Sequence, residues 1–362
     1  MQPFGRWQVL SSGKLINTSR QMSELVFGLV LVKSVWRASF YLINHLLMKN
    51  IILLFACLLV YTFSEAQDKT VNKTFSGIKS IKLNTASGDI QIRKGSGSEV
   101  KVQVKYSYDD DNYKVVMDQS DARLILKEEF DRGSFSGTSS WTLEIPDNID
   151  VSMNTGSGDI IVENLKIEIK SNTGSGDVTL TGVDGELDFN TGSGDIELEN
   201  VMGEVAMNTG SGDIRARKGK GNYAFNAGSG DIRLEDLNGD FNMNSGSGNV
   251  NARSITITAA SSFNTGSGST TVALAGPLDH NISLNSGSGD ATLNFGGHPI
   301  SGEVVMTADE RNGEIVAPFK FDKEEVIDEN GNSRRIRKTA KLGSKDIRIK
   351  VGTGSGTAEI VK

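Results

Sequence analysis

Apolar and polar residues alternate in short runs along most of this chain, and glycine-rich turns separate the runs. Gly194 is followed by Asp-Ile-Glu-Leu and Gly203 by Glu-Val-Ala-Met, so that apolar residues recur at every second position. A period of two is typical of a strand that buries one of its faces. The pattern therefore predicts an all-β protein built from many short strands.

The turns recur at a fixed spacing. Eight turns begin with Asn, the first six at a constant 18-residue interval and the last two after wider gaps of 20 and 21, at Asn154, Asn172, Asn190, Asn208, Asn226, Asn244, Asn264 and Asn285. An early copy begins at Asn84 and a degenerate late copy at Gly352. Glycine also recurs at every ninth position from Gly176 to Gly248, so each repeat holds two strand-and-turn units.

Two strands and two turns per repeat predict one rung of a single-chain parallel β-helix, or β-solenoid, in which equivalent residues of successive rungs stack. The expected inward residues of one rung stack on those of the rung before: Ile196, Leu198, Val205 and Met207 on Val178, Leu180, Leu187 and Phe189. An antiparallel meander of nine-residue units also fits the spacing and stays open as an alternative. Glycine is expected at the corners because a tight turn needs positive φ there.

Two stretches outside the regular repeats, residues 99–145 and 302–350, also alternate but lack the period. We expect them to form irregular β elaborations at both ends of the solenoid, where they would cover its open edges. The expected domain is therefore a β-solenoid over residues 67–362, with regular repeats at about 151–295.

The N-terminal region reads as a targeting segment. Residues 48–66 combine a short basic start, an apolar run and the small residues Ser64 and Ala66, which are the parts of a signal peptide. We expect cleavage near Ala66 and export to the periplasm, cell surface or extracellular space, with residues 1–47 an over-extended start outside the mature protein. A membrane anchor from about residue 25 to 63 is the alternative, and Lys33 and Arg37 argue against it.

Charge and cysteine content follow from that cleavage. Removing the six basic and two acidic residues of 1–66 takes the formal net charge from −7 to −11, and it removes Cys57, the only cysteine. An acidic exported protein does not suit nucleic acid, whose phosphates dominate such binding. We expect no membrane span in the mature chain, and an envelope protein or glycan as the partner.

Two segments carry a resemblance to a known family. "LEIPDNIDVSMNTGSGDI" at 143–160 and "DIRIKVGTGSGTAEI" at 346–360 resemble the start and end of the repeats in DUF4097, a bacterial exported family with repeated SGDI turns whose members are often labelled adhesins. The resemblance covers about residues 74–362. It implies a parallel β-helix-like fold outside the cytoplasm, and it supplies no catalytic residues.

An aspartate column is the first candidate for chemistry. It consists of Asp89, Asp159, Asp177, Asp195, Asp213, Asp231 and Asp290. Stacked at a strand spacing of about 4.8 Å, the carboxylates would need compensation, either from Ca²⁺ or from hydrogen bonds to turn N–H groups. We favour turn hydrogen bonds, because Asn249 and Ser269 interrupt the column.

Three further columns have structural interpretations. The Asn column is expected to form a ladder of amide hydrogen bonds. The Thr column beside it would suit ice binding, but Ala227, Ser245 and Ser286 break it. The basic cluster Arg215, Arg217, Lys218 and Lys220 is expected to balance acids, with Arg217 between Glu199 and Glu235 and Arg253 one rung further on.

Signals for catalysis are nearly absent. Only two histidines, His280 and His298, follow residue 66, and no metal-ligand or nucleophile motif accompanies them. We assign no catalytic residue, no cofactor-binding residue, no metal ligand and no cofactor. The expected function is a non-enzymatic binding, adhesion or structural surface in the bacterial envelope. The alternative is a carbohydrate-active protein that binds or cleaves polysaccharide on the same scaffold.

Overall fold

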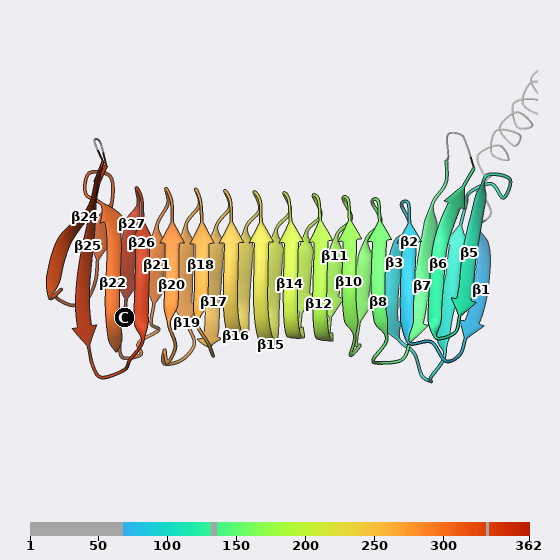
Figure 1. The fold of residues 1–362 in the computed structure, drawn as a ribbon, viewed down its shortest axis with the longest axis horizontal. Coiled ribbons are helices and arrows are strands. Elements are labelled where there is room, and N and C mark those ends of the chain that lie inside the picture. Colours follow the sequence, from blue (N-terminus) through green and yellow to red (C-terminus); the bar gives the residue numbers. More distant parts are fainter. Residues whose placement is uncertain (1–67, 132–135, 331–332) are drawn as a thin grey trace, which may run out of the picture. The chain divides into compact units, whose positions relative to one another are not determined.

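A computed structural model describes residues 68–131, 136–330 and 333–362, and the side chains of these residues except 328–330 and 333. The start expected at 1–47 and the signal peptide expected at 48–66 lie outside the described residues. Every regular element in the described ranges is a strand, and the 27 strands form one continuous sheet (Figure 1). The described part contains no helix long and apolar enough to cross a membrane. The predicted all-β class is confirmed.

The sheet folds into two layers that face each other across the core. Layer A carries the Asn column, and its strands in spatial order are β5 (Tyr113–Ser120), β6 (Arg123–Phe130), β2 (Ser80–Thr85), β8 (Asp150–Thr155), β10 (Glu168–Thr173), β12 (Asp184–Thr191), β14 (Met202–Thr209), the second halves of β15 (Ile214–Ala227) and β16 (Ile232–Ser245), β18 (Ser261–Thr265), β20 (Ile282–Ser286), β26 (Arg348–Thr353), β22 (Gly302–Asp309), β25 (Ser333–Leu342) and β24 (Lys323–Asn330).

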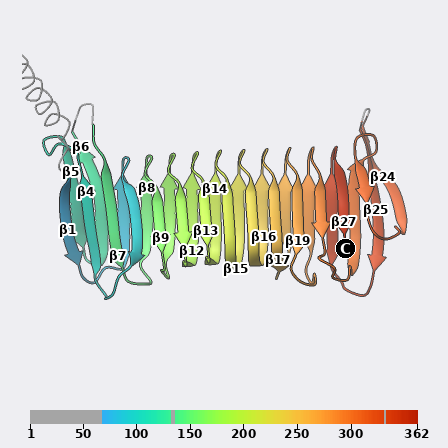
Figure 2. The same ribbon diagram turned by 180° about the vertical axis from the view of Figure 1, so that it is seen from behind.

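Layer B faces layer A. Its strands in spatial order are β1 (Lys69–Phe75), β4 (Val100–Tyr106), β7 (Ser139–Ile145), β3 (Asp89–Lys94), β9 (Ile160–Glu163), β11 (Val178–Thr181), β13 (Ile196–Glu199), the first halves of β15 and β16, β17 (Val250–Ile257), β19 (Thr270–Leu274), β21 (Ala291–Asn294), β27 (Thr357–Val361) and β23 (Glu314–Val316). Figure 2 shows the strands from behind.

Successive repeats pair in parallel and in register. Asn172 lies opposite Asn190 in layer A, and Val178 lies opposite Ile196 in layer B, so each partner is the equivalent residue of the next repeat. The meander alternative is wrong, because neighbouring repeats of an antiparallel meander would pair in opposite directions. Each 18-residue rung contributes one strand to each layer.

Antiparallel strands lie at both ends of this parallel stack. The early repeat at Asn84 forms the rung β2–β3, and the chain then leaves it to build β4 to β7 before it returns at β8. The late repeat at Gly352 forms the rung β26–β27, with β22 to β25 inserted before it. The expected β elaborations at 99–145 and 302–350 therefore extend outward from the first and last rungs.

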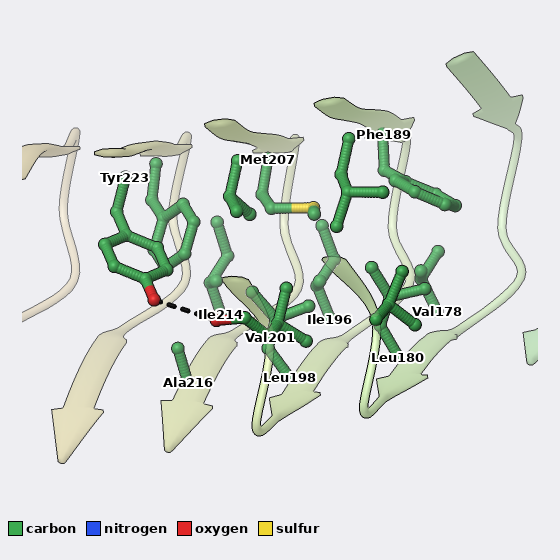
Figure 3. Close-up of a cluster of buried hydrophobic side chains, with 14 of the residues drawn as sticks. Val178, Leu180, Phe189, Ile196, Leu198, Val201, Met207, Ile214, Ala216 and Tyr223 are labelled. Atoms are coloured by element: carbon green, nitrogen blue, oxygen red, sulfur yellow. Dashed lines mark hydrogen bonds between the residues drawn. The ribbon is translucent and has the colours of Figure 1, made fainter. Parts of the chain in front are cut away.

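The core consists of stacked columns of apolar side chains (Figure 3). Val178 lies opposite Ile196, and Leu180 opposite Leu198, in layer B. Leu187 lies opposite Val205, and Phe189 opposite Met207, in layer A. All eight of these side chains are buried, as predicted, and burial of such a side chain stabilises the fold by about 1.5–3 kcal/mol.

In one rung, smaller side chains in layer B compensate for a larger side chain in layer A. Ala216 and Gly219 stand where the rung before has Leu198 and Val201, whereas Tyr223 replaces Val205. A Cβ on Gly219 would overlap the hydroxyl of Tyr223, which instead donates a hydrogen bond of 2.9 Å to the carbonyl of Val201 (Figure 3). The small residues of layer B thus make room for the large ring of layer A.

The corner glycines have a different cause from the one predicted. Gly210 and Gly212 are not among the residues with positive φ. A Cβ on either residue would overlap the carbonyl oxygen of its equivalent in the rung before, Gly192 or Gly194. Glycine is therefore required because successive rung backbones approach each other closely, and this correction holds for the whole Gly-Ser-Gly corner.

Positive φ occurs instead at the looser corner, and mostly without glycine. One column of equivalent positions has φ between 52° and 64°, at Asn164, Gly182, Asn200, Lys218, Asp236 and Ser254. This conformation is uncommon for residues other than glycine, asparagine and aspartate. Lys218 and Ser254 are therefore the strained members of the column.

The Thr column is buried and binds the backbone. Thr209 accepts a hydrogen bond from the N–H of Gly212 and donates one to the carbonyl of Gly194 in the rung before, both at 3.0 Å. Ser245 makes the same two bonds at 2.9 Å, and Ala227 has no side-chain oxygen to make them. Because its members are buried, the column presents no surface for ice binding.

The glycine columns yield a first prediction. Gly212→Ala places a methyl group against the carbonyl of Gly194, and we expect a loss of about 1–3 kcal/mol in the free energy of unfolding. Gly276→Ala is the control, since nothing lies within 4 Å of a Cβ there, and we expect a change within about 0.5 kcal/mol. Urea unfolding followed by circular dichroism measures both, and equal stabilities would contradict the close-approach explanation.

Two buried serines of layer A are predicted to have opposite effects. Ser171 lies in the core with a hydroxyl that has no hydrogen-bond partner among the described residues, so Ser171→Ala is expected to raise the free energy of unfolding by about 1 kcal/mol. Ser245→Ala removes two hydrogen bonds and is expected to lower it by about 1–2 kcal/mol. Thermal unfolding of both variants tests this. If both substitutions changed the stability in the same direction, the effect of removing the hydroxyl would not depend on whether it has a hydrogen-bond partner.

Candidate functional site

The aspartate column forms a continuous hydrogen-bond ladder at the corner between the layers. The backbone N–H of Asp195 donates to Oδ1 of Asp177 at 2.8 Å, and the N–H of Asp213 donates to Oδ1 of Asp195 at 2.7 Å. The predicted turn hydrogen bonds are confirmed, with each donor one rung further on. Asn249 and Ser269 interrupt the row of carboxylates but not the ladder, because their side-chain oxygens accept the equivalent bonds from the N–H groups of Ser269 and Asp290.

Arginines neutralise part of this column. Arg215 bridges Asp195 and Asp213 at 3.0 and 2.6 Å, and Arg233 bridges Asp213 and Asp231 at 2.7 and 2.5 Å. Burial by itself raises the pKa of the Asp213 carboxyl. The hydrogen bond from the N–H of Asp231 and the charges of both arginines outweigh burial, and they lower the pKa below its ordinary value of 3.8.

A second column on layer B alternates in charge from rung to rung, as expected. Arg217 lies between Glu199 and Glu235 in register, with Arg253 beyond Glu235. Arg217 and Lys218 both bind the Glu199 carboxylate, at 3.2 and 2.9 Å. These side chains are solvent-exposed, so each pair contributes about 0.2–1 kcal/mol. Among the described residues, no three His, Cys, Asp or Glu side chains converge as metal ligands do.

The Asn column forms a ladder along the outside of layer A, as predicted. Asn226 donates from Nδ2 to Oδ1 of Asn208 at 2.8 Å and accepts from Asn244 at 3.0 Å. The ladder starts at Asn84 and continues to Asn285. It differs at one step, where Asn190 donates to Asp188 in its own strand and not to the asparagine of the rung before. Since an amide has two N–H groups and two lone pairs, Asn226 keeps one of each for a ligand.

A carboxylate with four donors lies at the N-terminal end of the stack. Glu128 accepts hydrogen bonds from Tyr113 at 2.9 Å, Trp141 at 3.1 Å, the N–H of Ala86 at 2.8 Å, and Ser139. Burial, and then the charge of Glu128, raises the pKa of the Tyr113 phenol above its ordinary value of 10.0. The node ties β5, β6 and β7 to the first corner. Its four acceptor bonds make it a structural joint.

A surface trough crosses layer A near its C-terminal end, with a volume of about 930 Å³. Its floor follows one outward-facing column in which Ser262 and Ser283 lie between Asn242 and Lys350. Two successive rungs therefore carry short side chains between longer ones, and β25 and the loop that carries Asp322 line the same hollow. The volume lies in the range of small-ligand sites in proteins.

The walls of the trough are charged, with nearly equal numbers of each sign. Its charged residues are Asp240, Glu303, Asp322, Asp346, Lys341, Arg348 and Lys350. Arg348 pairs with Glu303 at 2.6 Å, and its N–H donates to Oδ1 of Asn281 at 2.7 Å. The N–H of Lys341 donates to Asp322 at 2.8 Å, which fixes the loop before β24 against β25.

Sequence reasoning missed the trough and the Glu128 node. Asp240 and Lys341 are remote from each other in the sequence and line one trough only because β22 and β25 pack beside β26 at the end of the stack. The small residues at Ser262 and Ser283 gave no signal in the sequence, because Ala206 and Ala224 occupy the same outward column in earlier rungs. No sequence pattern marks Glu128 as the acceptor of four donors.

The sequence model of one family matches this chain. It is described as Toastrack DUF4097, and it matches residues 78–305, which is more than half of the chain. No curated protein sequence matches. The matched range runs from the first rung to β22, so it includes the N-terminal elaboration and all of the regular repeats.

Several solved structures are similar at low identity. A candidate lipid-binding protein from Parabacteroides distasonis has 14% identity and a TM-score of 0.43, covering 82% of this chain and 98% of that one. A candidate adhesin from Bacteroides fragilis has 14% identity and a TM-score of 0.32, with 81% and 97% covered. A candidate cell adhesion protein from Clostridium sporogenes has 15% and 0.25, with 81% and 99% covered. Scores this low carry no conclusion about function.

The Asp213 carboxylate is predicted to support the fold in an acid-dependent way. Because folding lowers its pKa, its ionised form stabilises the protein above pH 3.8, and this contribution is lost as pH falls through the folded pKa. Asp213→Asn keeps an Oδ1 acceptor for the ladder, as Asn249 does naturally, but loses both arginine pairs. We expect the variant to melt below the parent at pH 7 and the gap to close toward pH 2.5. A constant gap in melting temperature across this range would rule the prediction out.

Proposed function

The chain belongs to the Toastrack DUF4097 family, and on that premise we propose that it is a non-enzymatic binding or adhesion protein of the bacterial envelope. In this proposal the 18-residue rungs form a rigid β-solenoid that displays a ligand-binding face. The observation that carries the proposal is the trough on layer A, where β16, β18, β20, β22, β25 and β26 and the connections between them converge on one hollow.

Rigid display is the physical reason why a solenoid suits this role. Every strand of layer A between β2 and β26 pairs on both sides, so the backbone holds the outward side chains at fixed spacings and loses little conformational entropy when a ligand binds. The Asn ladder orients its amides in the same way. A surface of this kind binds through many matched contacts, and it needs no reactive group.

Export is the second part of the proposal. Residues 48–66 have the three parts of a signal peptide, and cleavage near Ala66 would leave a cysteine-free, acidic chain. The partner that we propose is an envelope protein or a glycan.

The alternative is a carbohydrate-active protein that cleaves polysaccharide. Asp240, Asp322 and Asp346 line one trough together with Lys341 and Lys350, and carboxylates in pairs are the groups that glycoside hydrolysis uses. Asp322 accepts a backbone N–H, however, so it acts as a structural acceptor for β25. We therefore rank binding above cleavage.

Binding to envelope material tests the proposal. We expect the immobilised protein to retain a component of envelope extract that soluble cell extract lacks, and we expect no growth of reducing ends when the protein is incubated with envelope polysaccharide. Protein recovered from the envelope should begin at Gln67. Retention of nothing would defeat the binding proposal, and sustained chain cleavage would establish the enzymatic alternative.

A further inference from the structure

The geometry of the trough points to its ligand. We propose that it binds a short neutral oligosaccharide across layer A, with the outward column of Ser262 and Ser283 as its floor. This inference rests on the proposed binding function and adds the chemical class of the ligand. Three features carry it, namely the shape of the hollow, its balance of charge, and the kind of hydrogen-bonding groups that it presents.

The shape suits a ligand that is longer than it is wide. Asn242, Ser262, Ser283 and Lys350 are successive register partners, so the floor crosses four strands at about 4.8 Å each, roughly 14 Å in all. The loop that carries Asp322 and the strand β25 that carries Lys341 form the wall toward the C-terminal end. A linear chain of a few sugar rings fits this path better than a compact metabolite.

The charge of the lining favours an uncharged ligand. Four acidic and three basic residues line the trough, and the strongest pair, Glu303 with Arg348, is already satisfied internally. A polyanion would meet Asp240 and Asp346, and a polycation would meet Lys341 and Lys350. Because bringing like charges together costs free energy, neither kind of polyion gains over a neutral ligand.

The hydrogen-bonding groups are a mixture of donors and acceptors. Carboxylates such as Asp240 only accept, and the Lys350 ammonium only donates. The Ser262 hydroxyl donates to Oδ1 of Asn242 at 3.1 Å and keeps its lone pairs to accept, and the Ser283 hydroxyl accepts from Asn285 at 3.1 Å and keeps its hydrogen to donate. Sugar hydroxyls also donate and accept, so they can satisfy such a lining at every position. The side chains of Asp240, Asp346 and Lys350 make no hydrogen bond or ion pair with any other described residue, and they are therefore available to a ligand.

An extended peptide fits this site less well. Peptides that join a sheet bind through the free backbone groups of an edge strand. Here β16, β18, β20, β26, β22 and β25 pair continuously across the trough, so its floor has no free edge. Recognition must come from side chains alone.

Filling the floor tests the inference. Ser283→Tyr places a ring in the trough, and Ala206→Tyr is the matched control, since Ala206 faces outward in layer A two rungs before Asn242 and does not line the hollow. The probes are an array of neutral, uronic-acid and amino-sugar oligosaccharides, with titration calorimetry on the hits. We expect neutral members to bind, Ser283→Tyr to weaken binding at least tenfold, and Ala206→Tyr to change it less than twofold.

Other outcomes separate this inference from the proposed function. Binding only to charged oligosaccharides, with affinity that falls steeply with salt, would overturn the neutral class. Neutral binding that Ser283→Tyr leaves intact would overturn the location. If no oligosaccharide binds but envelope extract is still retained, the inference fails and the binding function stands. If neither is retained, both fail. Melting temperatures of the two variants, expected within a few degrees of the parent, show that the ring has not unfolded the protein.

Discussion

Close packing of one rung backbone on the next is the constraint on which the rest of this structure depends. At the Gly-Ser-Gly corner two glycines in every rung after the first lie against the carbonyl oxygens of the rung before, and any side chain there would push the rungs apart. Because the corners stack without displacement, the strands that they connect also stay in register. The Asn, Asp and Thr columns are consequences of that register, since each places a hydrogen-bonding group where the next rung needs one.

The same constraint restricts the residue type at some positions of each rung and leaves it open at others. Inward positions must be apolar, and corner positions must bind backbone groups, so little choice remains there. Outside the Asn column, the outward positions of the strands carry no such requirement, and they differ from rung to rung. Short side chains at Ser262 and Ser283 hollow the outer face at no cost to the core, because both residues point away from it.

The sequence predicted whatever the regular period controls. Ile196, Leu198, Val205 and Met207 were identified as core residues, and Arg217 was placed between Glu199 and Glu235, because a repeat makes distant contacts local. The reason for the corner glycines was not predictable from the sequence. A positive φ and a close approach of two backbones both require glycine, so the sequence looks the same in either case. Positive φ at Lys218 and Ser254 was likewise hidden, because neither residue is typical of that conformation.

The missed features share a different cause. The Glu128 node joins residues of three antiparallel strands and one corner, and the trough joins β16 to a loop that follows it only much later in the chain. Both depend on how the elaborations fold back on the stack, and periodicity carries no information about that. The ladder also continues where the sequence shows that the aspartates stop, at Asn249 and Ser269. The ladder needs only an oxygen at that position, and amide and hydroxyl oxygens serve as well as a carboxylate.

The exchange of volume between Tyr223 and Gly219 has an evolutionary consequence. Compensation takes place inside one rung, between two residues close together in the sequence, and the Tyr223 hydroxyl bonds to a backbone carbonyl of the rung before, which any residue at position 201 would supply. A unit that balances its own volume can be duplicated or deleted as a block by recombination between similar DNA repeats. Proteins built in this way can change their length in steps of one whole rung while the core of every remaining rung stays the same.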